Sequence, residues 1–401
     1  MKADLTHLTP KNSAQAMLFA QWMPQPETER VPVWDCVGRV LAEDVIARYD
    51  LPVVRASTMD GVAVDSRRFA DGVPDASAWK LGTDYVRADT GDDFADAFDA
   101  VIAIENVTIL DQGGLAIAPD VKVTAGSNVK GRGADLKLGA VVLTAGTLLT
   151  VTDMAAAGMS GASEVTVLRK PRIGFVPSGS ELVPTGSELK RGQNFDTNSP
   201  MVAAMLREMG AEPVMHPIVR DDKAALHEVV DELLPQCDIL ILNAGTSLGD
   251  EDYCAQVLAE RGKVLFHGVA AVPGRPMSMA IVDGKPVVNL SGPAFAAFYS
   301  VDWAIRAMVC LWFGQPLPQR QRVKVKLAGP LQVPPIFSMM AALRLTREPD
   351  GTLTAVQLST RGPNSAGGAA ILTADAVYVS ALGEKPHAPG EELEVELLRR
   401  L

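Results

Sequence analysis

The sequence predicts a multidomain protein in which one three-layer α/β domain is combined with β-rich parts. Three observations lead to this fold class. Short apolar runs alternate with helical patterns over residues 171–315, as in a parallel sheet covered by helices on both faces. Residues 50–135 are rich in Asp, Gly and alternating apolar residues, which indicates a β-rich insert. After Pro318 apolar and polar residues alternate again, which predicts a small C-terminal β-barrel or, as the alternative, a sandwich.

The α/β domain is predicted from the order of its strands and helices. A buried strand is expected at residues 173–176, and a helix at 202–209, where apolar residues recur at i, i+3, i+4 and i+7. A second helix begins at Asp222, further strands are expected at 239–242, 264–266 and 287–288, and a long helix starts at Phe295. In such a fold the ligand site lies at the carboxyl ends of the strands.

The same patterns divide the chain into four domains. Residues 1–49 and 136–170 are expected to form an N-terminal helix and a linking domain, and 50–135 the insert. Residues 171–315 form the α/β domain and 316–401 the C-terminal barrel. At about 100–200 residues per domain, a chain of 401 residues accommodates this organisation.

Composition restricts the function classes. A net charge of -11 argues against general binding to nucleic acids or anionic membranes, because an acidic chain is not attracted to either. The four cysteines lack C-x-x-C spacing and favour free thiols in a reducing compartment. We see no signal-peptide pattern and no run near the ~20 apolar residues of a membrane span. The most apolar stretch, 295–313, contains Asp302 and Arg306 and predicts a buried helix, so we expect a cytoplasmic protein.

Three loops at predicted strand ends are candidates for anion binding. They span residues 177–182, 243–253 and 272–276, and their small residues let backbone N–H groups approach an anion. Asp252, at the start of a helix, fits either a helix cap or a metal ligand. Each loop alone is weak evidence, because strand, glycine loop and helix follow one another in any α/β sheet.

Other polar positions have simple structural explanations. Met59-Asp60-Gly61 fits an ordinary turn, and Asp221-Asp222 fits the N-terminal cap of a helix. The five histidines are scattered, and no Ser/His/Asp or Cys/His arrangement can be argued.

An ordered set of motifs is more specific than any single loop. The segment at 57–64 (STMDGVAV) resembles the SAMDGYAV signature of the MoeA and gephyrin E-domain family, the molybdopterin molybdenumtransferases. Thr90-Gly91 with Glu105 and Gly133-Ala134-Asp135 resemble further segments of that insert. In the α/β part, the resemblance rests on 178–182 (SGSEL), 196–199 (DTNS), 245–253 (GTSLGDEDY) and 273–276 (PGRP). These segments occur in the family's order along nearly the whole chain.

The resemblance implies an activity and an assembly. Members of the family insert molybdate into adenylylated molybdopterin, release AMP and use a divalent cation, which we expect to be Mg²⁺. They are elongated homodimers of four domains, with an α/β domain that resembles the molybdopterin adenylyltransferases. Their active site lies between the α/β domain of one subunit and the insert of the other. A molybdopterin adenylyltransferase, and molybdoenzymes or their chaperones, are the partners that this activity implies.

The resemblance also implies the site residues, position by position. Catalytic roles fall on Asp60, Asp135, Glu181, Asp221, Asp252 and Arg275. Asp221 (chosen over Asp222 by alignment) and Asp252 are the implied metal ligands, which fits phosphoanhydride cleavage with Mg²⁺ held by carboxylates. The implied binding residues are Thr90, Ser178, Gly179, Gly245, Ser247, Gly249, Pro273, Gly274 and Ser365.

The chain departs from the family at the corner that holds the oxyanion. Val272 replaces the first lysine of the Lys-Pro-Gly-Lys-Pro motif, Arg275 replaces the second, and Gly268 stands where relatives have a further lysine. The family's LPGNPVSA becomes LSGPAFAA at residues 290–297. Because molybdate is a dianion and arginine is not interchangeable with lysine, these changes predict weaker molybdate binding.

Three functions are therefore compared. The leading one is a working molybdenumtransferase, which the carboxylates retained on several loops favour. The second is a paralogue that binds molybdopterin or a partner protein as a scaffold or carrier without turnover. The third, another α/β enzyme that acts on a nucleotide, leaves the insert motifs unexplained.

Overall fold

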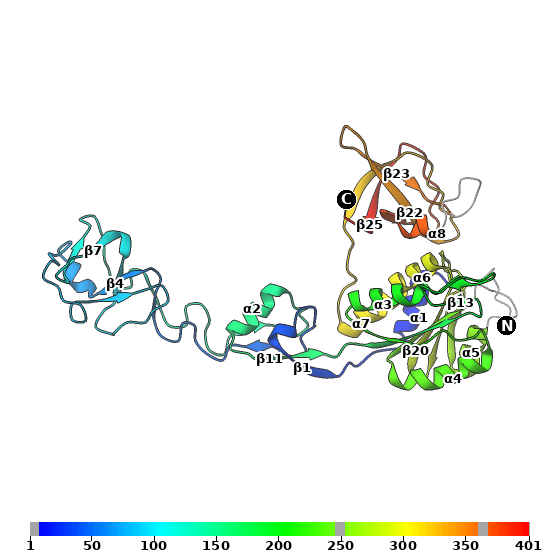
Figure 1. Ribbon diagram of the computed structural model, residues 1–401, viewed down its shortest axis with the longest axis horizontal. Helices are drawn as coiled ribbons and strands as arrows, with labels where there is room; N and C mark the ends of the chain where they lie inside the picture. Colours follow the sequence, from blue (N-terminus) through cyan, green and yellow to red (C-terminus); the bar gives the residue numbers. More distant parts are fainter. Residues whose placement is uncertain (1–7, 245–252, 360–367, 401) are drawn as a thin grey trace. The chain divides into compact units, whose positions relative to one another are not determined.

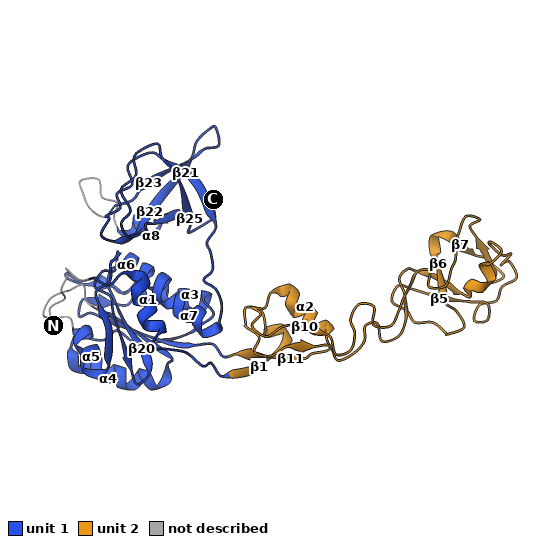
Figure 2. Cartoon of the chain, turned by 180° about the vertical axis from the view of Figure 1, so that it is seen from behind, with its two compact units in different colours: residues 1–27, 169–401 blue, residues 28–168 orange. Residues whose placement is uncertain are grey.

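The computed structural model describes residues 8–244, 253–359 and 368–400. The chain forms two compact units (Figure 2). The first contains the residues up to Glu27 together with those from Arg169 onward, and the second contains Thr28–Leu168.

The centre of the first unit is a six-stranded sheet. Its order is β15 (Glu212–Met215), β12 (Arg172–Ser178), β16 (Ile239–Ala244), β20 (Lys285–Leu290), β19 (Ser278–Val282) and β17 (Lys263–His267). Adjacent strands are parallel from β15 to β20, whereas β19 runs antiparallel to both of its neighbours. The predicted α/β fold is confirmed, with one antiparallel strand that we did not expect.

Alternating strand residues point to two separate cores. Ile173, Phe175 and Ile241 pack under α1 (Lys11–Phe19), α3 (Asn198–Glu208), α6 (Ala294–Ser300) and α7 (Arg306–Phe313). Val176 and Leu242 pack on the other face under α4 (Lys223–Leu233) and α5 (Tyr253–Arg261). Figure 1 shows α4 and α5 on one side of the sheet and α1, α3 and α6 on the other. The sheet is therefore the middle of three layers.

The position of helix α1 differs from the expected boundary. Ala14, Leu18 and Trp22 are buried in the core of the α/β domain, so residues 8–27 belong to this domain and not to the linking domain. The spacing of these residues gives the segment one apolar face to bury, and the core that covers this face is the one formed on the α/β sheet.

The most apolar helix runs without a break from Ala294 to Phe313 through a π-helical turn at Val301–Ile305. Among the described residues it is the one helix long and apolar enough to cross a membrane, by length and composition only. Of its most apolar 18-residue stretch, 61% is buried inside the protein. Asp302 on this helix pairs with Arg306 and Arg320. A core helix passes the same test, and its contacts agree with the buried helix that we predicted.

The C-terminal part is a closed five-stranded barrel, as predicted. Its strands are β22 (Ser338–Arg347), β23 (Leu353–Gln357), β21 (Arg322–Leu327), β25 (Glu392–Leu397) and β24 (Ala376–Val379), and pairing between β22 and β24 closes it. The short strand β18 (Ala271–Val272), which belongs to the α/β domain, pairs in parallel with the start of β22. Helix α8 (Gly368–Leu372) lies against α6. The barrel is thus attached to the loop that carries Arg275.

The second unit contains two modules with separate cores. In the linking module β1 (Thr28–Pro32) pairs with β11 (Glu164–Leu168) and β2 (Val45–Ile46) with β10 (Val141–Leu143), beside helix α2 (Val151–Met159). In the insert β4 (Gly61–Val64) lies between β5 (Tyr85–Ala88) and β6 (Ala100–Ala103). Two further antiparallel pairs complete it: β3 (Ala56–Ser57) pairs with β9 (Val129–Lys130) across the two ends of the insert, and β7 (Val107–Ile109) forms a hairpin with β8 (Leu115–Ile117).

Candidate functional site

A pocket of about 610 Å³ lies at the carboxyl end of β12, where the fold predicts a ligand. We call it the strand-end pocket. It is lined by residues from three segments that are distant in sequence, namely 179–185, 196–200 and 216–220. The first two are motif segments on which the family resemblance rests, and the third leads directly to Asp221. The structure therefore brings together three of the regions that were predicted separately.

Side-chain amides fix the loops beside this pocket. Asn198 Nδ2 donates to Asn243 Oδ1 at 2.8 Å and to the Gly292 carbonyl at 2.7 Å, while Asn243 Nδ2 donates to the Ser291 carbonyl at 3.0 Å. Both side chains are buried, and Asn198 Oδ1 has no hydrogen-bond partner among the described residues. A buried acceptor without a partner is costly, and the hydrogen bonds of the Asn198 Nδ2 group are what hold this side chain in its buried position.

Neither asparagine was among the predicted site residues. Both stood inside predicted motifs or loops, and the signal that could have identified them is an amide at the end of a buried strand or at the start of a helix. Asp196 has a structural role beside them: it accepts from the Ser199 backbone N–H at 3.0 Å and from the Ser199 hydroxyl at the start of α3.

Ser178 and Gly179 end strand β12 in a tight arrangement. Ser178 is 4% exposed, and its hydroxyl donates a long contact of 3.5 Å to the Arg220 carbonyl. A Cβ on Gly179 would lie 2.9 Å from Glu181 Oε2 and 2.9 Å from Leu182 Cγ. The exposed Glu181 carboxylate thus folds back over the strand end, and a side chain at 179 would displace it and crowd Leu182.

The structure separates the roles of the two adjacent aspartates. Asp222 caps helix α4, because its side chain accepts from the Ala224 backbone N–H at 2.8 Å. Asp221 is exposed and precedes that cap, next to Arg220 at the rim of the strand-end pocket. Asp222 therefore has the capping role that the sequence suggested for the pair, and Asp221 as the functional carboxylate stays a prediction. The described residues contain no group of three side chains placed to hold a metal ion.

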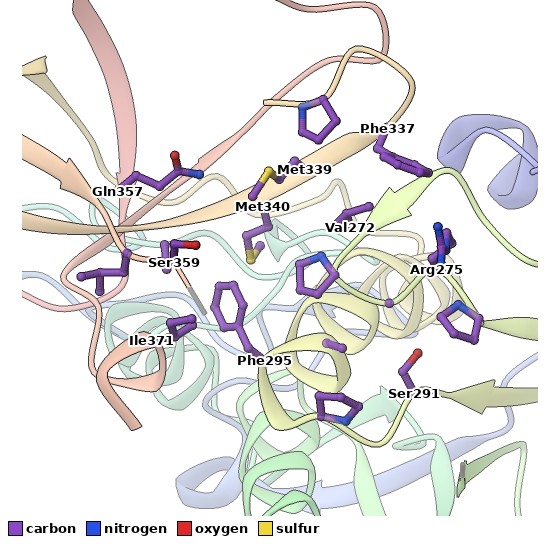
Figure 3. Close-up of a pocket in the computed structure, with 18 residues that line it drawn as sticks. Val272, Arg275, Ser291, Phe295, Phe337, Met339, Met340, Gln357, Ser359 and Ile371 are labelled. Atoms are coloured by element: carbon purple, nitrogen blue, oxygen red, sulfur yellow. The ribbon is translucent and has the colours of Figure 1, made fainter. Parts of the chain in front are cut away.

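A second pocket, of about 630 Å³, lies between the Arg275 loop and the barrel (Figure 3). We call it the corner pocket. Val272, Pro273, Gly274 and Arg275 form one wall, and Met339, Met340 and Gln357 belong to the barrel wall. Gly274 has a φ of +110°, and a Cβ there would lie 2.7 Å from Ser300 Oγ, so this position admits no side chain. The loop is held close to α6 in this way.

Arg275 is the cation of the corner pocket. Its guanidinium lies over the Phe337 ring, 5.9 Å from the centroid, and in the described part of the chain it forms no ion pair. The two replaced lysine positions differ in their surroundings. Val272 lines the pocket, whereas Gly268 has a φ of +88° and a Cβ there would lie 2.8 Å from Leu8 Cδ2. A side chain is therefore accepted at 272 and strained at 268.

Two predicted residues of the insert are in direct contact. Thr90 donates to Asp60 Oδ1 from its backbone N–H at 2.7 Å and from its hydroxyl at 2.8 Å. The backbone hydrogen bond and then the hydroxyl bond lower the pKa of Asp60, so this exposed carboxylate stays ionised. A Cβ on Gly61 would lie 1.9 Å from the Ile102 carbonyl oxygen, which explains the glycine after Asp60. Asp135, also exposed, pairs with Lys130 at 3.0 Å.

Five predicted site residues lie outside the described residues. They are Gly245, Ser247, Gly249, Asp252 and Ser365. The implied metal pair of Asp221 and Asp252 is among the arrangements that are therefore left as predictions.

The fold and these pockets define a class of protein when they are compared with known families. Residues 9–161 match the MoeA N-terminal region (domain I and II), and residues 181–309 match the probable molybdopterin binding domain. The chain therefore joins a MoeA-type N-terminal region to a domain of the molybdopterin-binding class, and the strand-end pocket belongs to the second part.

Whole-chain comparisons identify the family. The chain is 31% identical over 290 residues to the molybdopterin molybdenumtransferase of Staphylococcus aureus (strain COL), which is 68% of either chain. It is 27% identical over 393 residues to that of Bacillus subtilis (strain 168), which is 94% of this chain and 91% of the relative. The solved molybdopterin biosynthesis MoeA protein of Pyrococcus horikoshii OT3 has the same fold, with a TM-score of 0.73 at 24% identity over 98% of this chain and all of that one. The protein belongs to the molybdopterin molybdenumtransferase (MoeA) family.

Proposed function

We propose that the protein inserts molybdate into adenylylated molybdopterin and releases AMP. The observation that carries this proposal is the strand-end pocket, in which the segments around Gly179, Asp196 and Arg220 meet in a chain of this family. In the reaction, water breaks the phosphoanhydride bond, so that AMP leaves and the terminal phosphate stays on the pterin. The two thiols of the pterin then form Mo–S bonds, and the oxide that they displace from molybdate leaves as water with the thiol protons.

The chain's own groups have distinct tasks in this proposal. Asn198, buried and bonded through its Nδ2 group to Asn243 and Gly292, holds the loops beside the strand-end pocket in place for the pterin nucleotide. The backbone N–H groups after β12 face the phosphates, where small residues permit a close approach. Arg275 holds the oxyanion in the corner pocket through charge-assisted hydrogen bonds.

The proposed reaction uses a divalent cation, for which the described residues offer one predicted carboxylate, Asp221. Mg²⁺ is usually held by one or two carboxylates together with substrate phosphates and water, and Asp221 supplies one carboxylate at the rim of the pocket. When bound, Mg²⁺ would neutralise charge on the phosphates during cleavage. Asp221 is the residue of the described chain that we propose to orient it.

Asn198→Asp tests the proposal at the strand-end pocket. The substitution keeps the size of the side chain but removes the Nδ2 donor to Asn243 and Gly292. We expect binding of adenylylated molybdopterin and AMP release to fall by about 10-fold or more, because the loops at the strand end lose two hydrogen bonds that hold them in place. Asn194→Asp on the exposed strand β14 (Asn194–Phe195) is the matched control and should retain both. Equal behaviour of the two variants would remove the strand-end pocket from the proposal.

A carrier without turnover is the second candidate. It is favoured by Val272 and Gly268, which leave Arg275 as the one charged side chain among the described residues that line the corner pocket. The two functions differ in one readout, because a carrier binds the pterin nucleotide and leaves its AMP in place.

We also propose a homodimer whose active site needs residues of both chains. The candidates are divided between the insert, with Asp60 and Thr90, and the α/β domain, with Asp221 and Arg275. Mixing inactive Asp60→Ala and Arg275→Gln proteins should restore part of the activity through hybrid dimers, and light scattering should give twice the chain mass. A monomer at micromolar concentration, or no recovery on mixing, would contradict this arrangement. A molybdopterin adenylyltransferase and the molybdoenzymes or their chaperones are the partners that supply the substrate and accept the product.

A further inference from the structure

The corner pocket has more space than a tetrahedral oxyanion uses. Its volume is about 630 Å³. Pockets that enclose whole organic ligands measure about 300–1,000 Å³. An oxyanion with four oxygens occupies on the order of 100 Å³, if each oxygen takes about as much room as a water molecule. Molybdate at Arg275 would therefore leave most of the pocket to other groups.

The polar end of the corner pocket offers one charge and one free hydroxyl. Arg275 is the one charged side chain among the described residues that line it. Ser291, also in the lining, is 4% exposed, and its Oγ has no hydrogen-bond partner in the described part of the chain. A group with a single negative charge satisfies both, whereas a dianion keeps one charge without a counter-ion.

Most of the other side chains in the lining are apolar, with Gln357 and Ser359 as the polar exceptions. Phe295 on α6, Met339 and Met340 on β22 and Ile371 on α8 contribute side chains to the space. Figure 3 shows Phe295 and Met340 in the middle of the pocket, with Arg275 and Ser291 on one side of them and Ile371 on the other. Methionines adapt to ligands of different shape. The pocket thus has an anion-binding end that continues into an apolar chamber.

We propose that the corner pocket binds a small organic monoanion with an apolar body, for which a medium-chain monocarboxylate is the simplest representative. The carboxylate would accept hydrogen bonds from the Arg275 guanidinium and the Ser291 hydroxyl. The apolar body would lie against Phe295, Met340 and Ile371. This inference does not depend on the proposed function, but such a ligand would compete with an oxyanion for Arg275.

Titration calorimetry on the full chain tests the site with octanoate as the probe. We expect one saturable octanoate site per chain, with at least 10-fold weaker binding of acetate, which lacks the apolar body, and of 1-octanol, which lacks the charge. Arg275→Gln should weaken octanoate by about 10- to 100-fold and Ser291→Ala by about 2- to 10-fold, from the usual worth of charged and neutral hydrogen bonds. Arg322→Gln removes an exposed arginine of the barrel and is the matched control, with unchanged affinity expected.

Phe295→Ala separates the two ends of the pocket. It should weaken octanoate several-fold and leave acetate unchanged, because only the apolar body contacts the ring. Thermal unfolding of each variant shows whether it is folded, and Ser291→Ala keeps the test valid if Arg275→Gln is not. Absence of saturable octanoate binding, or octanoate affinity that is equal in wild type, Arg275→Gln and Ser291→Ala, overturns this proposal. AMP release measured on the same samples stands or fails separately, so the proposed function is not judged by this result.

Discussion

Val272→Lys returns a cation to the corner pocket at the position where the structure accepts one. Val272 is half-buried at the end of β18 and lines the same pocket as Arg275. A charge-assisted contact contributes about 1.5–3 kcal/mol, which is roughly 10- to 100-fold in affinity. Partial burial costs the new ammonium some of its hydration, which moves the gain toward the lower limit. We therefore expect about a 10-fold lower half-saturating molybdate concentration.

The assay is AMP release from adenylylated molybdopterin as a function of molybdate. Val264→Lys adds the same charge on the exposed part of β17 and serves as the control for net charge. Gly268→Lys is not an equivalent restoration, because its backbone is left-handed and its Cβ would meet Leu8. If Val272→Lys and Val264→Lys have the same molybdate dependence as the wild type, the lost lysines do not limit oxyanion binding and our reasoning about this corner is wrong.

Three further predictions concern single elements of the fold. Asp222→Ala should lower the free energy of unfolding by about 1 kcal/mol through loss of the α4 cap and leave turnover intact. Asp221→Asn should instead lower turnover at unchanged stability. The reverse pattern in denaturation and AMP-release measurements would exchange the roles of the two aspartates. Gly61→Ala places a methyl group 1.9 Å from the Ile102 carbonyl oxygen and should lower the free energy of unfolding, measured with urea, by at least about 1–3 kcal/mol. Gly131→Ala, where a Cβ meets open space, is the control and should change it little. Equal effects of the two substitutions would contradict the pairing of β4 with β6. Burial opposes protonation of His387, but its contacts with Glu384 at 2.7 Å and Glu391 at 2.9 Å outweigh this and raise its pKa. The resulting stabilisation is complete below the unfolded pKa of about 6.5 and is lost as pH rises through the folded pKa. The melting temperature should therefore fall over that pH range in the wild type and fall less in His387→Gln, and parallel pH profiles of the two proteins would refute this prediction.

The α/β domain was predictable where local patterns decide the structure. The strand at 173–176 is a short apolar run that ends at Pro177-Ser178-Gly179, the helix at 202–209 has apolar residues at helical spacing, and the structure contains both. Strand β19 was missed although its signal was present. Asp283 and Gly284 have φ values of 49° and 77° in the turn between β19 and β20, and Asp-Gly between apolar runs is a strong hairpin signal.

Other features depend on contacts that a local pattern does not contain. The apolar face of α1 predicts a helix but not which core covers it, and the structure places it on the α/β sheet. The pairing of β18 with β22, which brings Val272 and Arg275 to the barrel, joins residues more than sixty positions apart. Asn198 and Asn243 likewise acquire their meaning only when the fold places one beside the other.

The central claim is tested most directly by following AMP and molybdenum in one sample. The full chain is incubated with adenylylated molybdopterin, molybdate and Mg²⁺, AMP is quantified by chromatography, and pterin-bound molybdenum is quantified by mass spectrometry after gel filtration. Our account predicts that AMP and pterin-bound molybdenum appear in equal amounts, and that both are lost in Asn198→Asp. Intact adenylylated molybdopterin bound to the protein, with neither AMP nor molybdenum gained at saturating molybdate, would contradict the account and identify the protein as a carrier.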